Sequence, residues 1–278
     1  MGTLFVVATP IGNLEDASPR VLRALREASL IAAEDTRHTG KLLRHFGIDT
    51  PTISYHAHNE RARRERLLSA LADGDVALVT DAGTPGVSDP GNDLVQAALA
   101  AGYPVSPVPG PSSAVAAVSA SGLVPGPFVM LGFLPRERAP RRALLARAAG
   151  PGFPMVLFEA PGRVAATLRE VLDALGDRPA VLARELTKLH EEVRPGTLSS
   201  LAETLAAEPP RGEVVLVVAG ADDDAVAEDP ASVVAGLRRA GLGVSEAARE
   251  AARLTGLPKS ELYGLARAWS PDDPQAGN

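Results

Sequence analysis

The sequence has 278 residues, of which 45% are hydrophobic, and a formal net charge of −6 at pH 7. This length predicts one large domain or two of ordinary size, and the acidic balance argues against a broadly basic nucleic-acid binder. The chain contains no cysteine, which excludes disulfides and thiolate metal sites, and no apolar run approaches the roughly 18 residues of a membrane span.

Residues 3–121 alternate between strand and helix patterns, which is typical of a doubly wound α/β domain. Short apolar runs predict strands at 4–9, 30–33, 52–54, 76–80 and 103–105. Ser18 and Pro19 predict a helix start, because serine caps a helix and proline suits its first position. Further helices are expected at 41–46, 59–72, 94–101 and 114–119. We assign residues 1–122 to the first domain.

A Gly/Pro-rich hinge at 122–127 introduces a second α/β domain, which we assign to residues 123–221. Its strands are expected at 128–131, 155–158, 180–183 and 213–218, and its helices at 141–149, 163–175 and 198–207. An acidic linker is predicted around 222–230, and residues 271–278 are expected to fray. Between them, helices at 233–240, 245–254 and 258–269 form a helical extension over 231–270, with the last two joined as in a helix-turn-helix.

The most informative feature is the loop after the strand at 76–80. Three glycines and two prolines fall within residues 83–91, which excludes helix and strand there. Similar Gly/Pro-rich joints at 10–14 and 107–113 follow two other strands. Ligands of open α/β sheets bind beyond the carboxyl ends of the strands, and glycine lets the backbone approach a ligand closely. The three joints therefore predict a cofactor pocket, although no dinucleotide-binding or P-loop fingerprint is present.

Several motifs support a more specific interpretation. They lie at 8–14, 33–37, 81–91, 108–114, 132–136, 158–163, 184–188 and 254–259. The longest reads Asp81-Ala82-Gly83-Thr84-Pro85-Gly86-Val87-Ser88-Asp89-Pro90-Gly91. In this order and over nearly the whole chain, the motifs resemble those of the bacterial small-subunit ribosomal RNA methyltransferases, a branch of the tetrapyrrole methylase superfamily.

The resemblance implies two consecutive α/β domains of the tetrapyrrole methylase type, with a cofactor cleft between them and a small C-terminal helical extension. It implies S-adenosylmethionine-dependent 2′-O-methylation of a cytidine ribose in the decoding region of small-subunit (16S) ribosomal RNA. The implied partners are that RNA or the assembled 30S subunit, and a second copy of the chain in a homodimer. Gly83-Thr84-Pro85 replaces the Gly-Asp-Pro of the tetrapyrrole branch, which counts against a porphyrin substrate.

The resemblance also implies which positions hold the cofactor. Carried over by motif, they are Pro10, Ile11, Thr84, Val87, Ser112, Ser113, Ala114, Phe158, Glu159, Leu186 and Glu213.

Transfer of a methyl group to a ribose hydroxyl needs alignment of the reactants and a base that takes the hydroxyl proton. Asp35 and Asp81 both fall just past strand ends and are the candidate catalytic residues. Each aspartate could instead cap the segment that follows it. Glu34 and Glu159 are further candidates, so the base stays open at this point.

Arginines point to the RNA-binding surface. Arg136, Arg138, Arg141 and Arg142 lie within seven residues, which predicts either a phosphate-contacting loop or a plain basic surface. Arg37 is a further RNA-binding candidate. His56 and His58 lack carboxylate or cysteine partners at matching spacing, so we expect no metal. No signal peptide is recognised, and we expect a cytoplasmic protein without membrane contact.

Two other functions compete with RNA methylation. A tetrapyrrole C-methylase would use the same fold on a small molecule, and a binding module would act through its C-terminal helices. The three Gly/Pro-rich joints disfavour the binding module, because a scaffold does not need them.

Overall fold

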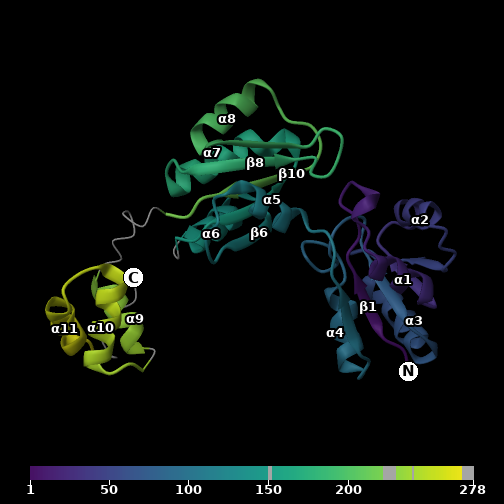
Figure 1. Cartoon of the computed structure of the whole chain (residues 1–278), viewed down its shortest axis with the longest axis horizontal. Coiled ribbons are helices and arrows are strands. Elements are labelled where there is room, and N and C mark those ends of the chain that lie inside the picture. Colours follow the sequence, from purple (N-terminus) through teal and green to yellow (C-terminus); the bar gives the residue numbers. More distant parts are fainter. Residues whose placement is uncertain (150–151, 222–229, 240, 271–278) are drawn as a thin grey trace. The chain divides into compact units, whose positions relative to one another are not determined.

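The computed structural model describes residues 1–149, 152–221, 230–239 and 241–270. The chain divides into two compact units, Met1–Gly220 and Ala221–Asn278. Figure 1 shows the elements of both units along the chain. The predicted acidic linker at 222–229 and the predicted frayed end at 271–278 lie outside the described residues.

The first sheet of Met1–Gly220 is parallel throughout, with strand order β3-β2-β4-β1-β5. Its strands are β1 (Leu4–Val7), β2 (Leu30–Ala33), β3 (Thr52–Ser54), β4 (Val76–Val79) and β5 (Val105–Val108). The helices between them are α1 (Pro19–Glu27), α2 (Thr36–His45), α3 (Glu60–Asp73) and α4 (Asn92–Ala100). β4, β1 and β5 are parallel neighbours, so the three Gly/Pro-rich joints lie together at the carboxyl ends of these strands, as predicted.

Helices cover both faces of this sheet. Successive residues of a strand point to opposite faces, so each strand contributes to two cores. In β4, Ala77 and Val79 pack in the core under α1 and α2, whereas Val76 and Leu78 pack in the core under α3 and α4. All four side chains are fully buried. This arrangement confirms the predicted doubly wound pattern.

The second sheet is mixed, with strand order β6-β7-β10-β8-β9. Its strands are β6 (Val129–Phe133), β7 (Met155–Glu159), β8 (Pro179–Arg184), β9 (Glu192–Thr197) and β10 (Val214–Val218). Only the β6–β7 pair is parallel. One face carries α6 (Arg138–Ala149), α7 (Val164–Leu175) and α8 (Leu198–Ala207).

The other face of the second sheet is covered by α5 (Ser113–Ser121), which follows β5 of the first sheet. Ala114 and Ala117 of α5 share a buried cluster with Val181 and Val217 of the second sheet, and Figure 1 shows α5 beside these strands. Ile11, from the loop after β1, joins the same cluster. The two sheets of Met1–Gly220 therefore meet where the predicted cofactor loops lie.

The described part of Ala221–Asn278 is a small helical unit. It contains α9 (Pro230–Arg239), α10 (Val244–Thr255) and α11 (Lys259–Ala268). Its core is built from small side chains, including Ala247, Ala248 and Ala251, together with Leu262. Among the described residues, no helix combines the length and apolar character that a membrane span requires.

Several element bounds differ from the sequence prediction by a few residues; α6 and α9, for example, each begin three residues earlier than predicted. Three differences have a clear physical reason or change the sheet. α2 begins at Thr36 rather than at residue 41, because Asp35 caps it by accepting a hydrogen bond from the backbone N–H of Arg37. β5 spans Val105–Val108 rather than 103–105. β9 was not predicted, since Pro195 and Gly196 within it are turn residues, but it pairs only with β8 and proline is tolerated in such an edge strand.

Candidate active site

Hydrogen bonds join the loops after β1, β4 and β5. Thr9 and Gly83 exchange backbone hydrogen bonds of 2.8 and 3.0 Å. The hydroxyl of Thr84 donates to the carbonyl of Pro111 at 3.4 Å. Gly83 has φ +76°, a conformation that glycine adopts without the steric cost of a Cβ. The three predicted loops thus form one structure at the sheet edge.

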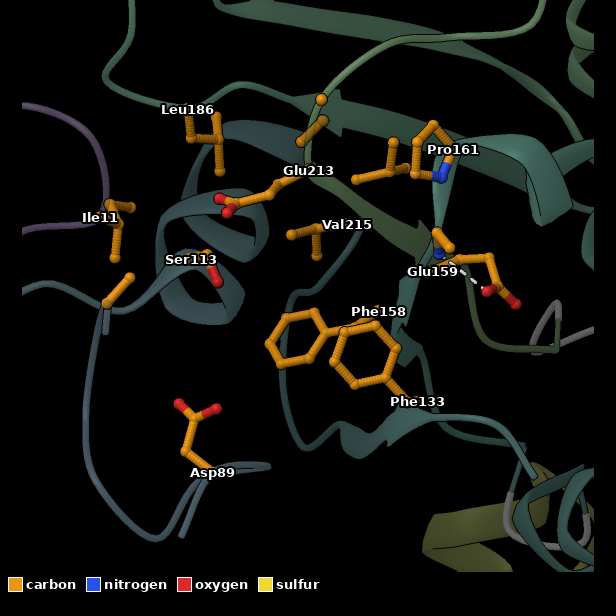
Figure 2. A pocket seen from close by; sticks show the side chains of 15 residues that line it. Ile11, Asp89, Ser113, Phe133, Phe158, Glu159, Pro161, Leu186, Glu213 and Val215 are labelled. Atoms are coloured by element: carbon orange, nitrogen blue, oxygen red, sulfur yellow. Dashed lines mark hydrogen bonds between the residues drawn. The ribbon is translucent and has the colours of Figure 1, made fainter. Parts of the chain in front are cut away.

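A cavity of about 350 Å³, the first cavity, opens where these loops face the second sheet. Its lining includes Asp89, Ser113, Phe133, Phe158, Leu186 and Glu213. Figure 2 shows the rings of Phe133 and Phe158 side by side in it, with their centroids 5.5 Å apart. Phe133 is 61% exposed, which is unusual for a large apolar side chain and typical of a ligand-binding surface. The volume lies within the range of small-molecule sites.

A second cavity, of about 370 Å³, adjoins the first and shares Ile11, Ala82 and Glu213 with it. Its lining also includes Pro10, Gly12, His38, Lys41, Asp81 and Lys188. In contrast to the first cavity, it combines basic and acidic side chains. The two cavities together offer neighbouring spaces for two reactants.

Lys188 ties the second sheet to the loop after β1. Its ammonium donates to Glu185 at 2.9 Å and to Glu213 at 3.1 Å. Gly12 packs so closely that a Cβ there would overlap the Lys188 side chain. Thr187 has a positive φ of 67°, which is rare for a β-branched residue. The loop that holds Lys188 is therefore strained and tightly placed.

The predicted cofactor residues fall into two groups. Seven line a cavity: Pro10, Ile11, Ser113, Phe158, Glu159, Leu186 and Glu213. Four line neither cavity: Thr84, Val87, Ser112 and Ala114. Ser112 caps α5, Ala114 is buried in the core, Val87 is exposed, and Thr84 bonds to the neighbouring loop. Ser112, Ala114 and Thr84 therefore shape the loops and the helix around the site without lining its cavities.

Glu159 lines the first cavity through a side chain whose carboxylate is already satisfied. One oxygen accepts from the hydroxyl of Thr167 at 2.6 Å, and the other accepts from the backbone N–H of Ala160 at 2.8 Å. Arg163 forms an ion pair with it at 3.3 Å, and the side chain is only 1% exposed. Glu159 therefore anchors the end of β7.

The two candidate catalytic aspartates have different surroundings. Asp35 lines neither cavity. Its carboxylate forms a 2.8 Å ion pair with Arg37, and the hydrogen bonds from Arg37 hold the pKa of this carboxyl well below its usual range. Asp81 lines the second cavity and accepts from the backbone N–H of Asp35 through one oxygen. Glu34 accepts from the backbone N–H of Asp81, and burial raises the pKa of Glu34.

Asp89 is a site residue that the sequence analysis did not single out. It lies in the longest motif but was not assigned a role, because nothing in the sequence shows that it lines the first cavity. Burial, followed by the nearby charges of Glu34 and Asp81, raises the pKa of Asp89 to about 6. Phe133 and Lys188 likewise lie within the motifs at 132–136 and 184–188, and the sequence alone indicates no role for either side chain.

The four clustered arginines do not have equal surroundings. Arg141 is only 13% exposed and donates to Glu170 at 2.6 Å. Arg136, Arg138 and Arg142 are exposed, and we refer to these three as the arginine patch. Arg37 is 89% exposed and pairs with Asp35.

The histidine pair His56 and His58 lies with ring centroids 6.0 Å apart. Within the described residues, no group of three or more His, Cys, Asp or Glu side chains is arranged to hold a metal ion. The absence of a metal stays a prediction.

The chain resembles known proteins over nearly its whole length. Residues 3–202 match the model of the family described as Tetrapyrrole (Corrin/Porphyrin) Methylases. Residues 224–270 match a family described as RsmI C-terminal HTH domain. The ribosomal RNA small subunit methyltransferase I of Synechocystis sp. is 46% identical over 95% of this chain and 97% of its own length. The protein of the same name from Xylella fastidiosa is 47% identical over 95% of this chain and 98% of its own.

The chain belongs to the ribosomal RNA small subunit methyltransferase I branch of the tetrapyrrole methylase family. This membership confirms the resemblance drawn from the sequence motifs.

Solved structures support the fold. The uroporphyrin-III C-methyl transferase from Thermus thermophilus, complexed with S-adenyl homocysteine, has a TM-score of 0.56 and 22% identity, over 79% of this chain and 97% of that one. The methyltransferase CobJ has a TM-score of 0.62 and 21% identity, over 80% of this chain and 95% of that one. These likenesses confirm the predicted tetrapyrrole methylase fold.

Proposed function

We propose that this protein transfers a methyl group from S-adenosylmethionine to the ribose 2′-hydroxyl of a cytidine in the decoding region of small-subunit ribosomal RNA. The observation that carries the proposal is the identity of 46–47% over 95% of the chain to relatives named ribosomal RNA small subunit methyltransferase I. These relatives share the C-terminal region, which matches its own family model. The match to the uroporphyrin-III enzyme covers only 79% of this chain at 22% identity. This likeness supports the fold and gives no support to a porphyrin substrate.

The first cavity fits the cofactor. Phe158, Leu186 and Val215 offer apolar contacts for an adenine ring, and the hydroxyl of Ser113 and the carboxylate of Glu213 offer polar ones. When bound, S-adenosylmethionine supplies an electrophilic methyl group on a positively charged sulfur. The rings of Phe133 and Phe158 offer apolar faces against which the cofactor can pack, which helps to hold its methyl group in line with the acceptor.

The second cavity, next to the first, takes the target nucleoside. Of the two aspartates, Asp81 is the better base, because it lines this cavity and, within the described residues, only one of its two carboxylate oxygens accepts a hydrogen bond. It would accept the proton of the 2′-hydroxyl. Asp35 is committed to capping α2 and to Arg37. Its role is to position Asp81, to which its backbone N–H donates.

RNA binds through the arginine patch and Arg37. Four exposed guanidinium groups supply phosphate contacts in a protein whose net charge is −6, so the shape of the target must add to the affinity. We further propose that the substrate is the ribosomal RNA itself or the assembled 30S subunit, that the protein acts as a homodimer, and that it works in the cytoplasm.

Transfer of a labelled methyl group tests this function. Undermethylated small ribosomal subunits, free ribosomal RNA and a porphyrinogen are each incubated with the protein and methyl-labelled S-adenosylmethionine. We expect label in the RNA, recovered as 2′-O-methylcytidine after nuclease digestion. Label in the porphyrinogen alone, or on a base of the RNA, would refute the proposal.

A further inference from the structure

We propose that Asp89 makes the first cavity selective for a positively charged ligand, so that S-adenosylmethionine binds more tightly than S-adenosylhomocysteine, its uncharged-sulfur product. The inference rests on the proposed function, because it assigns the cofactor to this cavity. It goes further by naming the residue that distinguishes the cofactor from the product.

The charge of the cavity wall is the first observation. Its described lining contains three carboxylates, those of Asp89, Glu159 and Glu213, and no lysine, arginine or histidine. The rest of the wall is mostly apolar and includes the phenyl rings of Phe133 and Phe158. A cation bound here would meet negative side chains and the negative faces of aromatic rings, both of which favour positive charge.

Two of the three carboxylates are neutralised by the protein. Glu159 pairs with Arg163 and accepts from the hydroxyl of Thr167. Glu213 accepts from the ammonium of Lys188 at 3.1 Å. Within the described residues, the carboxylate of Asp89 has no hydrogen-bond donor and no cation beside it. Asp89 is therefore the one uncompensated charge of the described lining.

The backbone holds this charge in place. Ser88, next to Asp89, has a positive φ of 66°, which is uncommon for a residue with a Cβ. The hydroxyl oxygen of Ser88 rests against Gly132 of β6, where a Cβ would lie 2.6 Å from it. Figure 2 shows the Asp89 carboxylate turned toward the space between Ser113 and the Phe133–Phe158 pair. A strained loop thus presents an unpaired carboxylate to the cavity.

The charged surroundings of Asp89 are all acidic. Glu34, beyond β2, and Asp81, beyond β4, repel its negative charge, and together with burial they raise its pKa to about 6. Glu159 and Glu213 face the cavity from the second sheet. A cation in the cavity would lower this pKa again, and each unit of that change corresponds to about tenfold tighter binding to the ionised form.

The consequence is a preference that depends on pH. Above pH 6 Asp89 is ionised, and the sulfonium of S-adenosylmethionine gains an attraction that the thioether of S-adenosylhomocysteine lacks. As the pH falls through 6, Asp89 becomes protonated and the preference shrinks. After methyl transfer the ligand has lost its positive sulfur, so this carboxylate favours product release over product retention.

Isothermal titration calorimetry of the full chain tests the inference. Affinities for S-adenosylmethionine and S-adenosylhomocysteine are measured at pH 7.5 and pH 5.5 for the wild type and for Asp89→Asn. We expect the ratio of the two affinities to fall about tenfold in Asp89→Asn at pH 7.5, through weaker binding of S-adenosylmethionine. We also expect the wild-type ratio to fall at pH 5.5, where that binding should release protons to the buffer.

Two variants serve as controls. Asp73→Asn removes the same charge from an exposed residue at the end of α3, outside both cavities, and should leave the ratio unchanged. Asp89→Glu keeps the charge and should retain most of the preference. An unchanged ratio in Asp89→Asn, with both ligands still bound, would overturn the inference alone. If the wild type bound neither S-adenosylmethionine nor S-adenosylhomocysteine, both the inference and the proposed function would be overturned.

Discussion

Replacing Thr167 by valine should destabilise the protein and weaken cofactor binding together. The hydroxyl of Thr167 donates to Glu159 at 2.6 Å, and the carboxylate it serves is 1% exposed. A hydrogen bond to a charged group contributes about 1.5–3 kcal/mol, and valine keeps nearly the same volume. Ala160 and Arg163 still serve the carboxylate. We therefore expect a loss of about 2 kcal/mol in the free energy of unfolding.

Urea unfolding followed by circular dichroism measures this loss, and calorimetry with S-adenosylhomocysteine measures the effect on the site. Affinity should fall because Glu159 fixes the end of β7, whose Phe158 forms the cavity wall. Thr204→Val is the matched control, since its exposed hydroxyl donates only to a carbonyl within α8, and it should stay within about 0.5 kcal/mol of the wild type. Equal effects of the two substitutions would refute the assigned role of Glu159.

Three further predictions concern the site. Gly12→Ala should lower methyl transfer to RNA at least tenfold by displacing Lys188 in the second cavity, as the labelled-methyl assay would show, whereas Gly40→Ala in α2, whose Cβ has room, should not. Neutralising the three arginines of the arginine patch should raise the KM for RNA and leave cofactor affinity unchanged. The slope of log binding constant against log salt concentration should become shallower by about 2–3, and an unchanged slope would contradict this. Folding raises the pKa of Asp89 from 3.8 to about 6, so the stability it contributes is full below pH 3.8 and is lost as the pH rises through 6. Asp89→Asn should therefore be more stable than the wild type in urea at pH 7.5, by on the order of 1 kcal/mol for this partly exposed group, and not at pH 3.5; equal gains at both pH values would contradict this.

The sequence predicted most of the first sheet well because its central strands β1, β2 and β4 are largely buried. The runs at 30–33 and 52–54 coincide with β2 and β3, and the glycine-rich loop does follow β4. Continuous apolar runs bounded by glycine and proline leave few alternatives to a buried parallel strand. Strand order was less accessible, but parallel strands end at a common edge, and this was enough to bring the three loops together.

β9 and the start of α2 show where local patterns fail. β9 is an exposed edge strand containing proline and glycine, and only its pairing with β8 makes it a strand. The first turn of α2 contains polar residues without an apolar period, and it is helical because Asp35 caps it. The packing of α5 against the second sheet could not be predicted either, because its small apolar residues would fit against either sheet.

The sequence predicted several residues that line the first cavity, but it did not predict which of its carboxylates are paired within the protein. Motif positions identified Ser113, Phe158 and Glu213, which do line the first cavity. The motifs could not separate Glu159, whose carboxylate is satisfied by the protein, from Asp89, whose carboxylate is not. That distinction depends on contacts between residues far apart in the chain, such as Ser88 with Gly132.

The measurement that tests the central claim most directly is mapping of methyl groups on small-subunit ribosomal RNA from cells. RNA from a strain lacking this gene is compared by mass spectrometry of nuclease fragments with RNA from the parent and from the strain complemented with the wild-type gene. The account predicts loss of a single 2′-O-methyl group on a decoding-region cytidine, restored by the wild-type gene and not by Asp81→Asn. An unchanged methylation pattern in the deletion strain would contradict it.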